Sequence, residues 1–246
     1  MNLRRIRILR RKSWLGKLIR LPFALIPSQA VLPIVSGPLK KFKWIKGSHN
    51  ISILLGTYEK KQTGTFLKAA SGVSVFWDLG AHAGYYSLLF HKASPKGKIF
   101  AFEPLAATVS IFNKHMSINH VVNYTIFTEA VSDKEGILRF NKTSSTVAGK
   151  LDDQGETEVK VVKLSGYLSE GILKVPQLIK MDIEGAEFEV LQDLKALLKA
   201  NKPTLFLSTH GKEVHDKCIA FLKDIGYELT PLDADNLSAS REVLAK

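Results

Sequence analysis

Residues 73–87 read VSVFWDLGAHAGYYS, and this stretch decides the fold class of the 246-residue chain. The run Val73–Trp77 is short, apolar and rich in β-formers, which is typical of a strand buried in a parallel sheet. Gly80 and Gly84 interrupt the run, and a helix-compatible segment begins at Tyr85. In an open α/β sheet the ligand binds outside the carboxyl end of a strand, where glycines let the backbone approach it. We therefore expect a ligand-binding loop between this strand and the helix.

The loop does not fit the dinucleotide-binding fingerprint, which needs three glycines spaced as GxGxxG. Only Gly80 and Gly84 are present, and Asp78 precedes them where a carboxylate would repel a diphosphate. A carboxylate at this point suits a cationic ligand, and S-adenosylmethionine carries both an ammonium group and a sulfonium. The loop therefore favours a methyl donor over a dinucleotide.

A second expected strand, 97–102, ends in Glu103-Pro104. A carboxylate there can accept hydrogen bonds from both hydroxyls of a ribose, the role of the acid that lies about 20 residues beyond a nucleotide-binding glycine loop. An acid near a helix start also interacts favourably with the helix dipole. Helix capping is therefore the competing interpretation of Glu103.

A third expected strand, 177–182, runs into a cluster of acids. Residues 175–187 read VPQLIKMDIEGAE, which places Asp182, Glu184 and Glu187 around one glycine. Taken alone, these acids are explained by capping and a solvated helix face. Since the glycine loop, Glu103 and this segment each follow an expected strand, a shared crevice at one edge of the sheet is favoured.

Strands and helices alternate along the chain, which predicts an α/β fold with a mainly parallel sheet covered by helices on both faces. We expect an N-terminal hairpin from strands near 41–46 and 51–56, a loop or short hairpin within 136–150, and an edge strand at 158–162. The other expected elements are helix 59–70, strand 73–78, helix 84–93, strand 97–102, helix 105–118, strand 123–131, strand 177–182, helix 186–199, strand 203–208, helix 212–225 and an antiparallel pair at 227–230 and 241–245.

The ordered motifs resemble those of the FkbM-type methyltransferases, a branch of the class I S-adenosylmethionine-dependent fold. The matching pieces are GTYE at 56–59, WDLGAHAGYYS at 77–87, FAFEP at 100–104, EAVSD at 129–133 and IKMDIEGAEFEVL at 179–191. The resemblance implies a Rossmann-like, seven-stranded sheet. It divides the chain into a basic and apolar N-terminal arm, 1–36, and a methyltransferase domain, 37–246.

The resemblance also implies a set of cofactor-binding residues. The methionine end of S-adenosylmethionine would lie along the Asp78–Gly84 loop, the ribose at Glu103 and the adenine near Ala130-Val131. The full set expected to contact the cofactor is Glu59, Asp78, Gly80, Ala81, His82, Gly84, Tyr85, Glu103, Pro104, Ala130, Val131 and Asp182.

Methyl transfer from a sulfonium is an in-line displacement, so the protein must chiefly align acceptor, methyl and sulfur, which is worth about 7–11 kcal/mol of the barrier. A hydroxyl acceptor must also lose a proton, and a general base adds about 10²–10⁴-fold. Asp182 is the first candidate, because a carboxylate beside the sulfonium can orient the donor and accept the proton. Glu184, Glu187 and His210 are the others, with capping as the simpler explanation of His210. Mg²⁺ or Mn²⁺ held by Asp182, Glu184 and His210 is an alternative, but we expect a site without metal.

The resemblance points to O-methylation of a sugar, a glycan, a lipid-linked molecule or another small metabolite. A nucleic-acid methyltransferase is the first alternative, prompted by the basic arm. Against it, amino-modifying enzymes of this fold carry Asn or Asp before Pro-Pro and an aromatic, where residues 181–184 read MDIE. A cofactor-binding module without enzymatic activity is the second alternative. Acceptor contacts are expected from residues 40–58 and 141–157.

The net charge of +12 arises in the N-terminal region. Residues 1–46 hold 12 Lys and Arg and no acid, so the other 200 residues carry 23 bases and 23 acids. The prolines between Leu21 and Pro38 argue against a transmembrane helix and a signal peptide. We expect the arm to contact the inner membrane surface, with a disordered leader as the alternative. The lone cysteine, Cys218, excludes an internal disulfide and indicates the cytoplasm.

Overall fold

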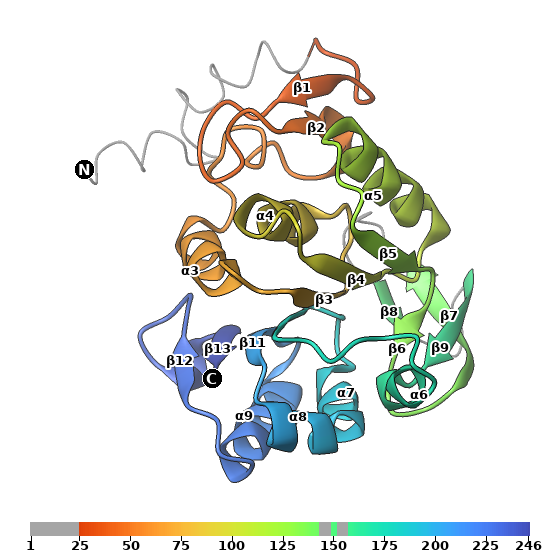
Figure 1. Cartoon of the computed structure of the whole chain (residues 1–246), viewed down its shortest axis with the longest axis vertical. Helices are drawn as coiled ribbons and strands as arrows, with labels where there is room; N and C mark the ends of the chain where they lie inside the picture. Colours follow the sequence, from red (N-terminus) through yellow and green to blue (C-terminus); the bar gives the residue numbers. More distant parts are fainter. Residues whose placement is uncertain (1–24, 143–148, 152–156) are drawn as a thin grey trace.

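The computed structural model describes residues 25–142, 149–151 and 157–246, and the account below concerns these residues. Seven strands form the central sheet: β3 (Val75–Leu79), β4 (Lys98–Phe102), β5 (Tyr124–Phe127), β10 (Leu178–Met181), β11 (Thr204–Ser208), β12 (Leu229–Pro231) and β13 (Glu242–Ala245). Their spatial order is β12-β13-β11-β10-β3-β4-β5 (Figure 1). Strands β11, β10, β3, β4 and β5 are parallel, and β13 runs antiparallel to both of its neighbours. The expected mainly parallel, seven-stranded sheet is confirmed.

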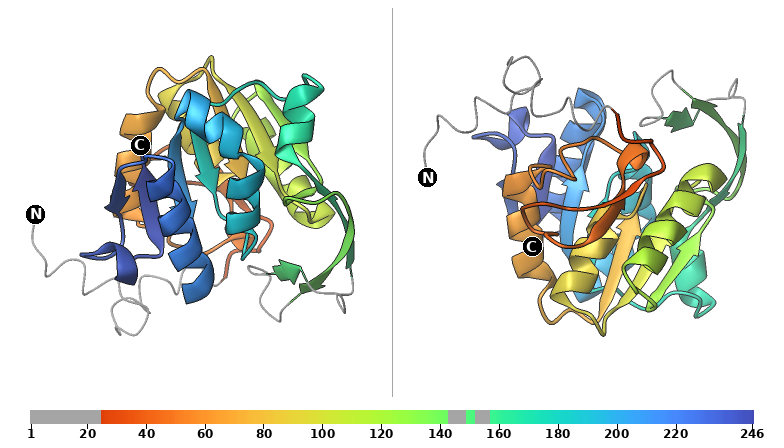
Figure 2. Two further views of the ribbon diagram at one scale, coloured as in Figure 1. Left: turned by 90° about the horizontal axis from the view of Figure 1, so that it is seen from below. Right: turned by 90° about the horizontal axis from the view of Figure 1, so that it is seen from above.

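Helices cover both faces of this sheet (Figures 1 and 2). One face carries α3 (Lys60–Ala70), α4 (Tyr85–Ala93) and α5 (Ala106–Ile118), and the other carries α6 (Leu164–Ser169), α7 (Glu187–Asp193), α8 (Lys195–Asn201) and α9 (Lys212–Asp224). Because successive strand residues point to opposite faces, Phe76 packs with the first group and Trp77 with the second. Both side chains are fully buried.

The N-terminal region differs from the expected hairpin. β1 (Val31–Pro33), within the segment expected as the arm, pairs antiparallel with β2 (Lys43–Ile45), and the short helix η1 (Lys46–Ser48) follows. Residues 51–56 form turns, so the expected strand there is wrong. Three of their N–H groups bond to carbonyl oxygens nearby in the chain, and the carbonyl oxygen of Leu54 accepts a bond from the N–H of Val35. Ile53 and Leu54 are buried against the α3, α4 and α5 side of the core. Residues 1–24 of the arm lie outside the described residues.

A second sheet accounts for two other differences. It contains β6 (Ala130–Val131), β7 (Gly136–Lys142), β8 (Gly149–Leu151) and β9 (Thr157–Val162) in the order β6-β9-β7-β8. The single strand expected at 123–131 is divided, because β5 pairs in the central sheet and β6 pairs with β9. The expected edge strand β9 lies between β6 and β7 instead. Parts of the expected acceptor segment, 143–148 and 152–156, lie outside the described residues.

The helix expected at 186–199 is two helices. The backbone at Leu194, with φ −88° and ψ 5°, departs from helical geometry between α7 and α8. Helix α6 was not predicted, and the short helix η2 (Leu237–Ala239) precedes β13. The remaining expected elements have bounds within two residues of those observed. None of the helices in the described part of the chain has the length and apolar character needed to cross a membrane.

Phe66 joins α3 to the sheet, and its removal should strongly destabilise the fold. Its fully buried ring makes edge contacts with Phe76, Tyr86 and Phe206 at centroid distances of 5.4, 4.9 and 5.2 Å. We expect Phe66→Ala to lower the free energy of unfolding by about 3–5 kcal/mol, measured by urea denaturation. The exposed Val122 supplies the control, since Val122→Ala should change it by less than about 0.5 kcal/mol. A loss below about 1 kcal/mol for Phe66→Ala would contradict this packing.

Candidate active site

Backbone hydrogen bonds tie together the carboxyl ends of three adjacent strands. The N–H groups of Gly80 and Ala81 donate to the carbonyl oxygen of Phe102, at 3.0 and 2.9 Å. The N–H of Asp182 donates to the carbonyl oxygen of Leu79 at 2.9 Å. The loops after β3, β4 and β10 therefore meet at one edge of the sheet, as a shared crevice requires.

Gly80 allows the closest of these approaches. Its φ is +79°, and a Cβ there would lie 1.9 Å from the carbonyl oxygen of Asp182. At Gly84, with φ +86°, a Cβ would lie 2.7 Å from Cε of Met116. A Cβ at position 80 would therefore overlap backbone atoms, and one at position 84 would require the side chains of Met116 and Phe112 to shift. The two glycines are needed for packing within the protein, which the motif alone did not reveal.

Asp78 lies beneath the loop, with 2% of its surface exposed. Its Oδ2 accepts a hydrogen bond from the Ser87 hydroxyl at 2.6 Å. On the adjacent strand β10, Asp78 pairs with Lys180. Burial raises the pKa of Asp78 to about 6, although Ser87 and Lys180 both favour the ionised form. Asp78 is thus a buried carboxylate at the base of the expected cofactor loop.

Glu103 connects the loop after β3 to the start of α5. Its two carboxylate oxygens accept hydrogen bonds from the N–H groups of His82 and Leu105, each at 3.1 Å. The residue is 6% exposed, and burial raises its pKa to about 7 against the effect of these two bonds. Leu105, whose N–H bonds to Glu103, also packs against the small cluster of Ala130, Val159 and Val161.

The remaining expected cofactor residues differ in their contacts and in their burial. Glu59, at φ +38°, precedes α3 and accepts a hydrogen bond from the hydroxyl of Tyr86 at 2.5 Å. Tyr85 is buried, and its ring contacts that of Tyr58 at 5.0 Å. Val131 is buried in β6, and Pro104, beside Glu103, is half-buried.

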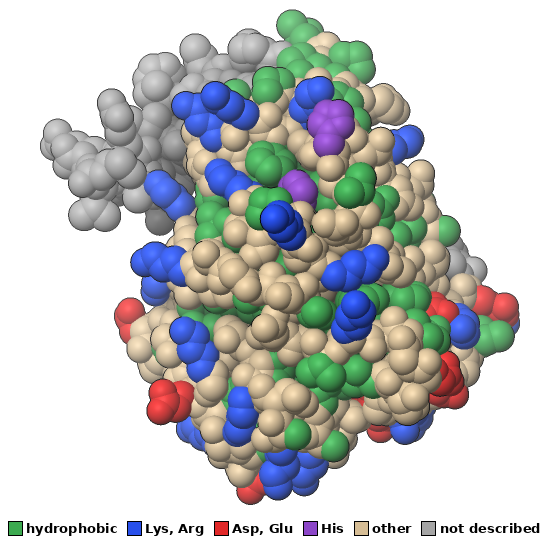
Figure 3. Space-filling view, viewed as in Figure 1, with side chains coloured by type: hydrophobic (Ala, Val, Ile, Leu, Met, Phe, Trp, Pro, Cys, Tyr) green, Lys and Arg blue, Asp and Glu red, His purple; other side chains and the backbone are tan. Residues whose placement is uncertain are grey.

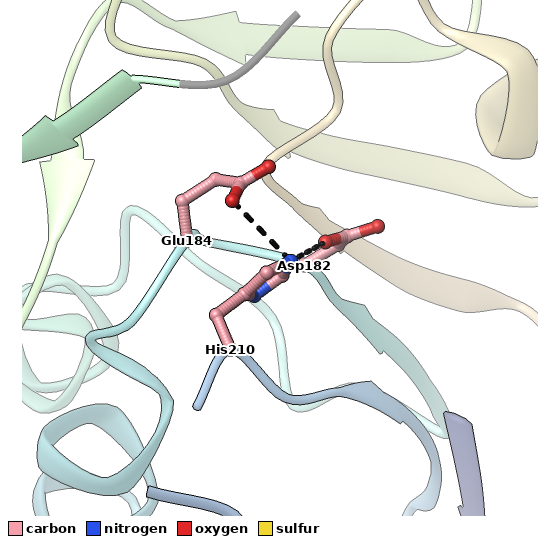
Figure 4. Close-up of side chains that lie close together, drawn as sticks. All are labelled: Asp182, Glu184 and His210. Atoms are coloured by element: carbon pink, nitrogen blue, oxygen red, sulfur yellow. Dashed lines mark ion pairs between the residues drawn. The ribbon is translucent and has the colours of Figure 1, made fainter. Parts of the chain in front are cut away.

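The expected catalytic residues Asp182, Glu184 and His210 converge at the ends of β10 and β11 (Figure 4). His210 Nε2 lies 3.6 Å from Oδ1 of Asp182 and 3.3 Å from Oε2 of Glu184. Each of the three side chains is about one-third exposed. Their nearest oxygen and nitrogen atoms all lie within 4.8 Å of one another, so they can hold a cation together.

Glu187 fixes the orientation of His210. It is fully buried, and its Oε1 accepts hydrogen bonds from His210 Nδ1 at 2.8 Å and from the N–H of Gly185 at 3.0 Å. Chiefly because of the bond to Glu187, the pKa of His210 lies above its usual value despite partial burial. Because Glu187 is buried and bonded to Nδ1, the pair of His210 and Glu187 is preorganised by the fold. Nearby, Glu184 has φ +59°, an unfavourable conformation for a residue with a side chain.

Lys180 is a buried cation next to this cluster, and the sequence reasoning missed it. Its Nζ lies 3.4 Å from Oδ2 of Asp182 and 3.8 Å from Oε2 of Glu242, and it donates to the hydroxyl of Ser208. Burial alone would lower the pKa of Lys180, but these carboxylates outweigh it and raise that pKa. The sequence does contain a signal for this residue, since Lys180 is the one charged residue in the otherwise apolar strand LIKM.

The segment after β2 brings further residues to the site. The ring of His49 lies 5.1 Å from the rings of Tyr58 and His82. Burial, reinforced by His82, lowers the pKa of His49 to about 4. The Nδ1 of His49 accepts a hydrogen bond from the N–H of Asn50 at 2.6 Å, so the neutral ring carries its proton on Nε2. Nε2 of His49 is therefore a hydrogen-bond donor.

His115 joins β2 to the glycine loop. Its Nδ1 donates to the carbonyl oxygen of Ala83 at 2.7 Å, and its Nε2 accepts from the N–H of Ile45 at 3.0 Å. The ring stacks on Trp44 with centroids 3.8 Å apart. Burial lowers the pKa of His115 to about 4, so the ring is neutral at pH 7. Sequence reasoning missed His115, because nothing near it in the chain indicates contacts about 30 and 70 residues away.

Comparison with known proteins identifies related sequences. The sequence model of the methyltransferase FkbM domain matches residues 78–229. Methyltransferase 1 of Beauveria bassiana is 28% identical over 144 residues, covering 48% of this chain and 57% of that protein. The hexuronic acid methyltransferase AglP of Haloferax volcanii is 25% identical over 138 residues, covering 54% of this chain and 55% of that protein. The chain thus spans little more than half the length of these relatives.

A solved structure shares the fold. The crystal structure of a methyltransferase FkbM from Methylobacillus flagellatus KT superimposes with a TM-score of 0.51 at 15% identity. The superposition covers 72% of this chain and 44% of that chain. At this identity the likeness concerns the arrangement of the strands and helices. It agrees with the class I methyltransferase fold that the sequence motifs indicate.

The buried His115 should make the fold sensitive to acid. Its pKa is about 4 in the folded state and 6.5 when solvated, so stability is present above pH 6.5 and declines as pH falls toward 4. Between pH 7.5 and 5 the expected loss is about 2 kcal/mol. We expect His115→Gln to lack this loss, measured by urea unfolding at both pH values.

Comparing pH differences between variants removes contributions common to both, including the opposing ones from Asp78 and Glu103. The half-buried His49 has a similarly lowered pKa, so His49→Gln supplies a second variant that tests the same effect. The exposed His120 supplies the control, since His120→Asn should retain the wild-type dependence. Equal acid sensitivity in all four proteins would contradict the assignment.

Proposed function

The chain belongs to the FkbM methyltransferase family, and we propose on that basis that it transfers the methyl group of S-adenosylmethionine to a hydroxyl of an acceptor. The observation that best supports this function is the meeting of the Gly80 loop, Glu103 and Asp182 at one edge of a parallel sheet. Carboxylates at such an edge suit a ligand with an ammonium group, ribose hydroxyls and a sulfonium.

Successive parts of the cofactor lie at the ends of successive strands. Its methionine end lies along the Asp78–Gly84 loop, where Asp78 and Asp182 supply negative charge. The ribose lies at Glu103, whose carboxylate oxygens offer about four lone-pair sites, of which two backbone N–H groups use two. The carboxylate can therefore also accept bonds from both ribose hydroxyls. The adenine lies beside Ala130 and Val131.

The acceptor hydroxyl reacts at the cluster of Asp182, Glu184 and His210. The bond from the acceptor oxygen to the methyl carbon forms as the carbon–sulfur bond breaks, and its electron pair stays on sulfur as a neutral thioether. The hydroxyl proton passes to a carboxylate of the cluster, with Asp182 as the first candidate. Positioning by the fixed loops supplies most of the acceleration.

A sugar or glycan is the favoured acceptor. The relative in Haloferax volcanii is a hexuronic acid methyltransferase, and its likeness to this chain supports a sugar as the acceptor, free or lipid-linked. Residues 40–58, where His49 and Tyr58 approach the cluster, supply acceptor contacts.

The N-terminal arm, 1–36, contacts the inner surface of the cytoplasmic membrane. In its described part Leu25 is 90% exposed, and the lysines at 40, 41 and 43 lie exposed close by in sequence. Basic side chains are spread over the face shown in Figure 3, whereas acidic ones lie toward its margins. This charge distribution suits an anionic surface or a membrane-linked substrate.

Two carboxylates test the cofactor assignment. Asp78→Asn and Glu103→Ala each remove a charged partner of the cofactor, so we expect S-adenosylhomocysteine and S-adenosylmethionine to bind about 10- to 150-fold more weakly. Isothermal titration calorimetry measures the affinity, and thermal melting shows whether each variant is folded. The exposed acid Glu135 supplies the control, Glu135→Gln. Wild-type affinity in both folded variants would refute the assignment.

Transfer of label tests the acceptor class. The full chain is incubated with S-adenosylmethionine labelled on its methyl group and with separated fractions of uronic-acid glycans, neutral glycans, lipids and RNA. We expect label in a glycan or lipid-linked glycan fraction, stable to the mild base that hydrolyses methyl esters. Label in RNA would favour the nucleic-acid alternative, and base-labile label would indicate a carboxyl acceptor in place of a hydroxyl.

A further inference from the structure

We propose that Asp182, Glu184 and His210 bind one divalent cation, Mn²⁺ or Mg²⁺, beside the methyl donor. This inference rests on the proposed function and departs from the sequence-based expectation of a site without metal. The three donors come from the ends of β10 and β11 and lie within 4.8 Å of one another (Figure 4). Carboxylate oxygens and an imidazole nitrogen are ligands suited to these two ions.

The orientation of the imidazole is the first support. Nδ1 of His210 bonds to Oε1 of the fully buried Glu187 at 2.8 Å, which leaves Nε2 directed between the two carboxylates. Metal-binding histidines generally donate their second ring N–H to a carboxylate or carbonyl, which fixes the ring and raises its basicity. Glu187 has this relation to His210.

The distances are the second support. Nε2 lies 3.3 Å from Oε2 of Glu184 and 3.6 Å from Oδ1 of Asp182. A charged hydrogen bond would be about 2.7–2.9 Å, so neither separation is that of a good hydrogen bond. Adjacent ligands of an octahedral ion with bonds of about 2.0–2.3 Å are about 2.8–3.3 Å apart. The Nε2 separation from Glu184 falls at the end of this range, and that from Asp182 needs a small closure onto the ion. The two carboxylate oxygens lie within 4.8 Å of each other, so they would also have to close onto the ion.

The balance of charge is the third support. His210 faces the carboxylates of Asp182, Glu184 and Glu187, and Oε2 of Glu187 is buried without a hydrogen-bond partner among the described residues. Lys180 lies on the other side of Asp182, nearest its second oxygen, and is shared with Glu242. One imidazole and one shared lysine therefore leave an excess of negative charge that a cation offsets.

The ion would assist the proposed transfer, in which the same bonds form and break. An acceptor hydroxyl bound to a divalent cation has a lower pKa, so its proton leaves more readily to a carboxylate oxygen that does not bind the ion. The ion would also fix the hydroxyl in place relative to the sulfonium. The cationic methyl donor by itself is the competing occupant of this negatively charged site.

Titration of the full chain with Mn²⁺, followed by the electron paramagnetic resonance signal of the free ion, tests the inference. We expect one bound Mn²⁺ per chain, displaced by Mg²⁺. His210→Ala and Glu184→Gln should each weaken binding at least tenfold. Glu187→Gln should weaken it about 10- to 100-fold, although Glu187 does not touch the ion, because it holds the imidazole. Melting curves without metal show that each variant is folded.

Matched controls and a parallel titration separate the outcomes. His120→Asn and Asp216→Asn change an exposed imidazole and an exposed carboxylate outside the cluster, and should bind Mn²⁺ like the wild type. Wild type that binds S-adenosylhomocysteine but no Mn²⁺ would overturn the metal site and leave the proposed function standing. Equal Mn²⁺ binding in all variants would also overturn it, as adventitious binding. Wild type that binds no S-adenosylhomocysteine would overturn the proposed function itself.

Discussion

The close approach of Gly80 to the carbonyl oxygen of Asp182 is the constraint on which the rest of the site depends. Two parallel strands place these residues at one edge, but only the missing side chain lets the loops touch. Once they touch, the N–H of His82 reaches the carboxylate of Glu103, and a third strand end joins the assembly. A Cβ at position 80 would part the loops that follow β3 and β10.

The second organising element is the buried positive charge of Lys180. A lysine in a core strand is costly unless carboxylates and hydrogen bonds compensate it. Asp182, Ser208 and Glu242 provide this compensation, and the ring of Tyr86 lies 5.3 Å from Nζ. Tyr86 in turn donates to Glu59, so a layer of linked polar groups connects α3 to the cluster. Removing one member of this layer would leave a buried charge unpaired, a larger cost than the value of the contact itself.

Short sequence motifs predict the elements of the structure that depend on neighbouring residues in the chain. The apolar runs before Asp78, Glu103 and Asp182 predict strands, and parallel pairing then brings their ends together, so the core sheet and the candidate site follow from short motifs. The turns at 51–56 do not follow, because burial of Ile53 and Leu54 against α3, α4 and α5 decides that conformation. The contacts of His115 are equally hidden, since its partners lie far away in the chain.

Strand β2, with Trp44 and Ile45, and the glycine loop form one packed unit. His115 is hydrogen-bonded to both, through Ala83 on one side and Ile45 on the other, while its ring stacks on Trp44. Lifting this strand would expose the tryptophan and leave a buried ring nitrogen without its donor, which costs about 1–3 kcal/mol for the unmade bond alone. Trp44 and Ile45, which precede His49 in the chain, are therefore held by the same histidine that bonds to the glycine loop.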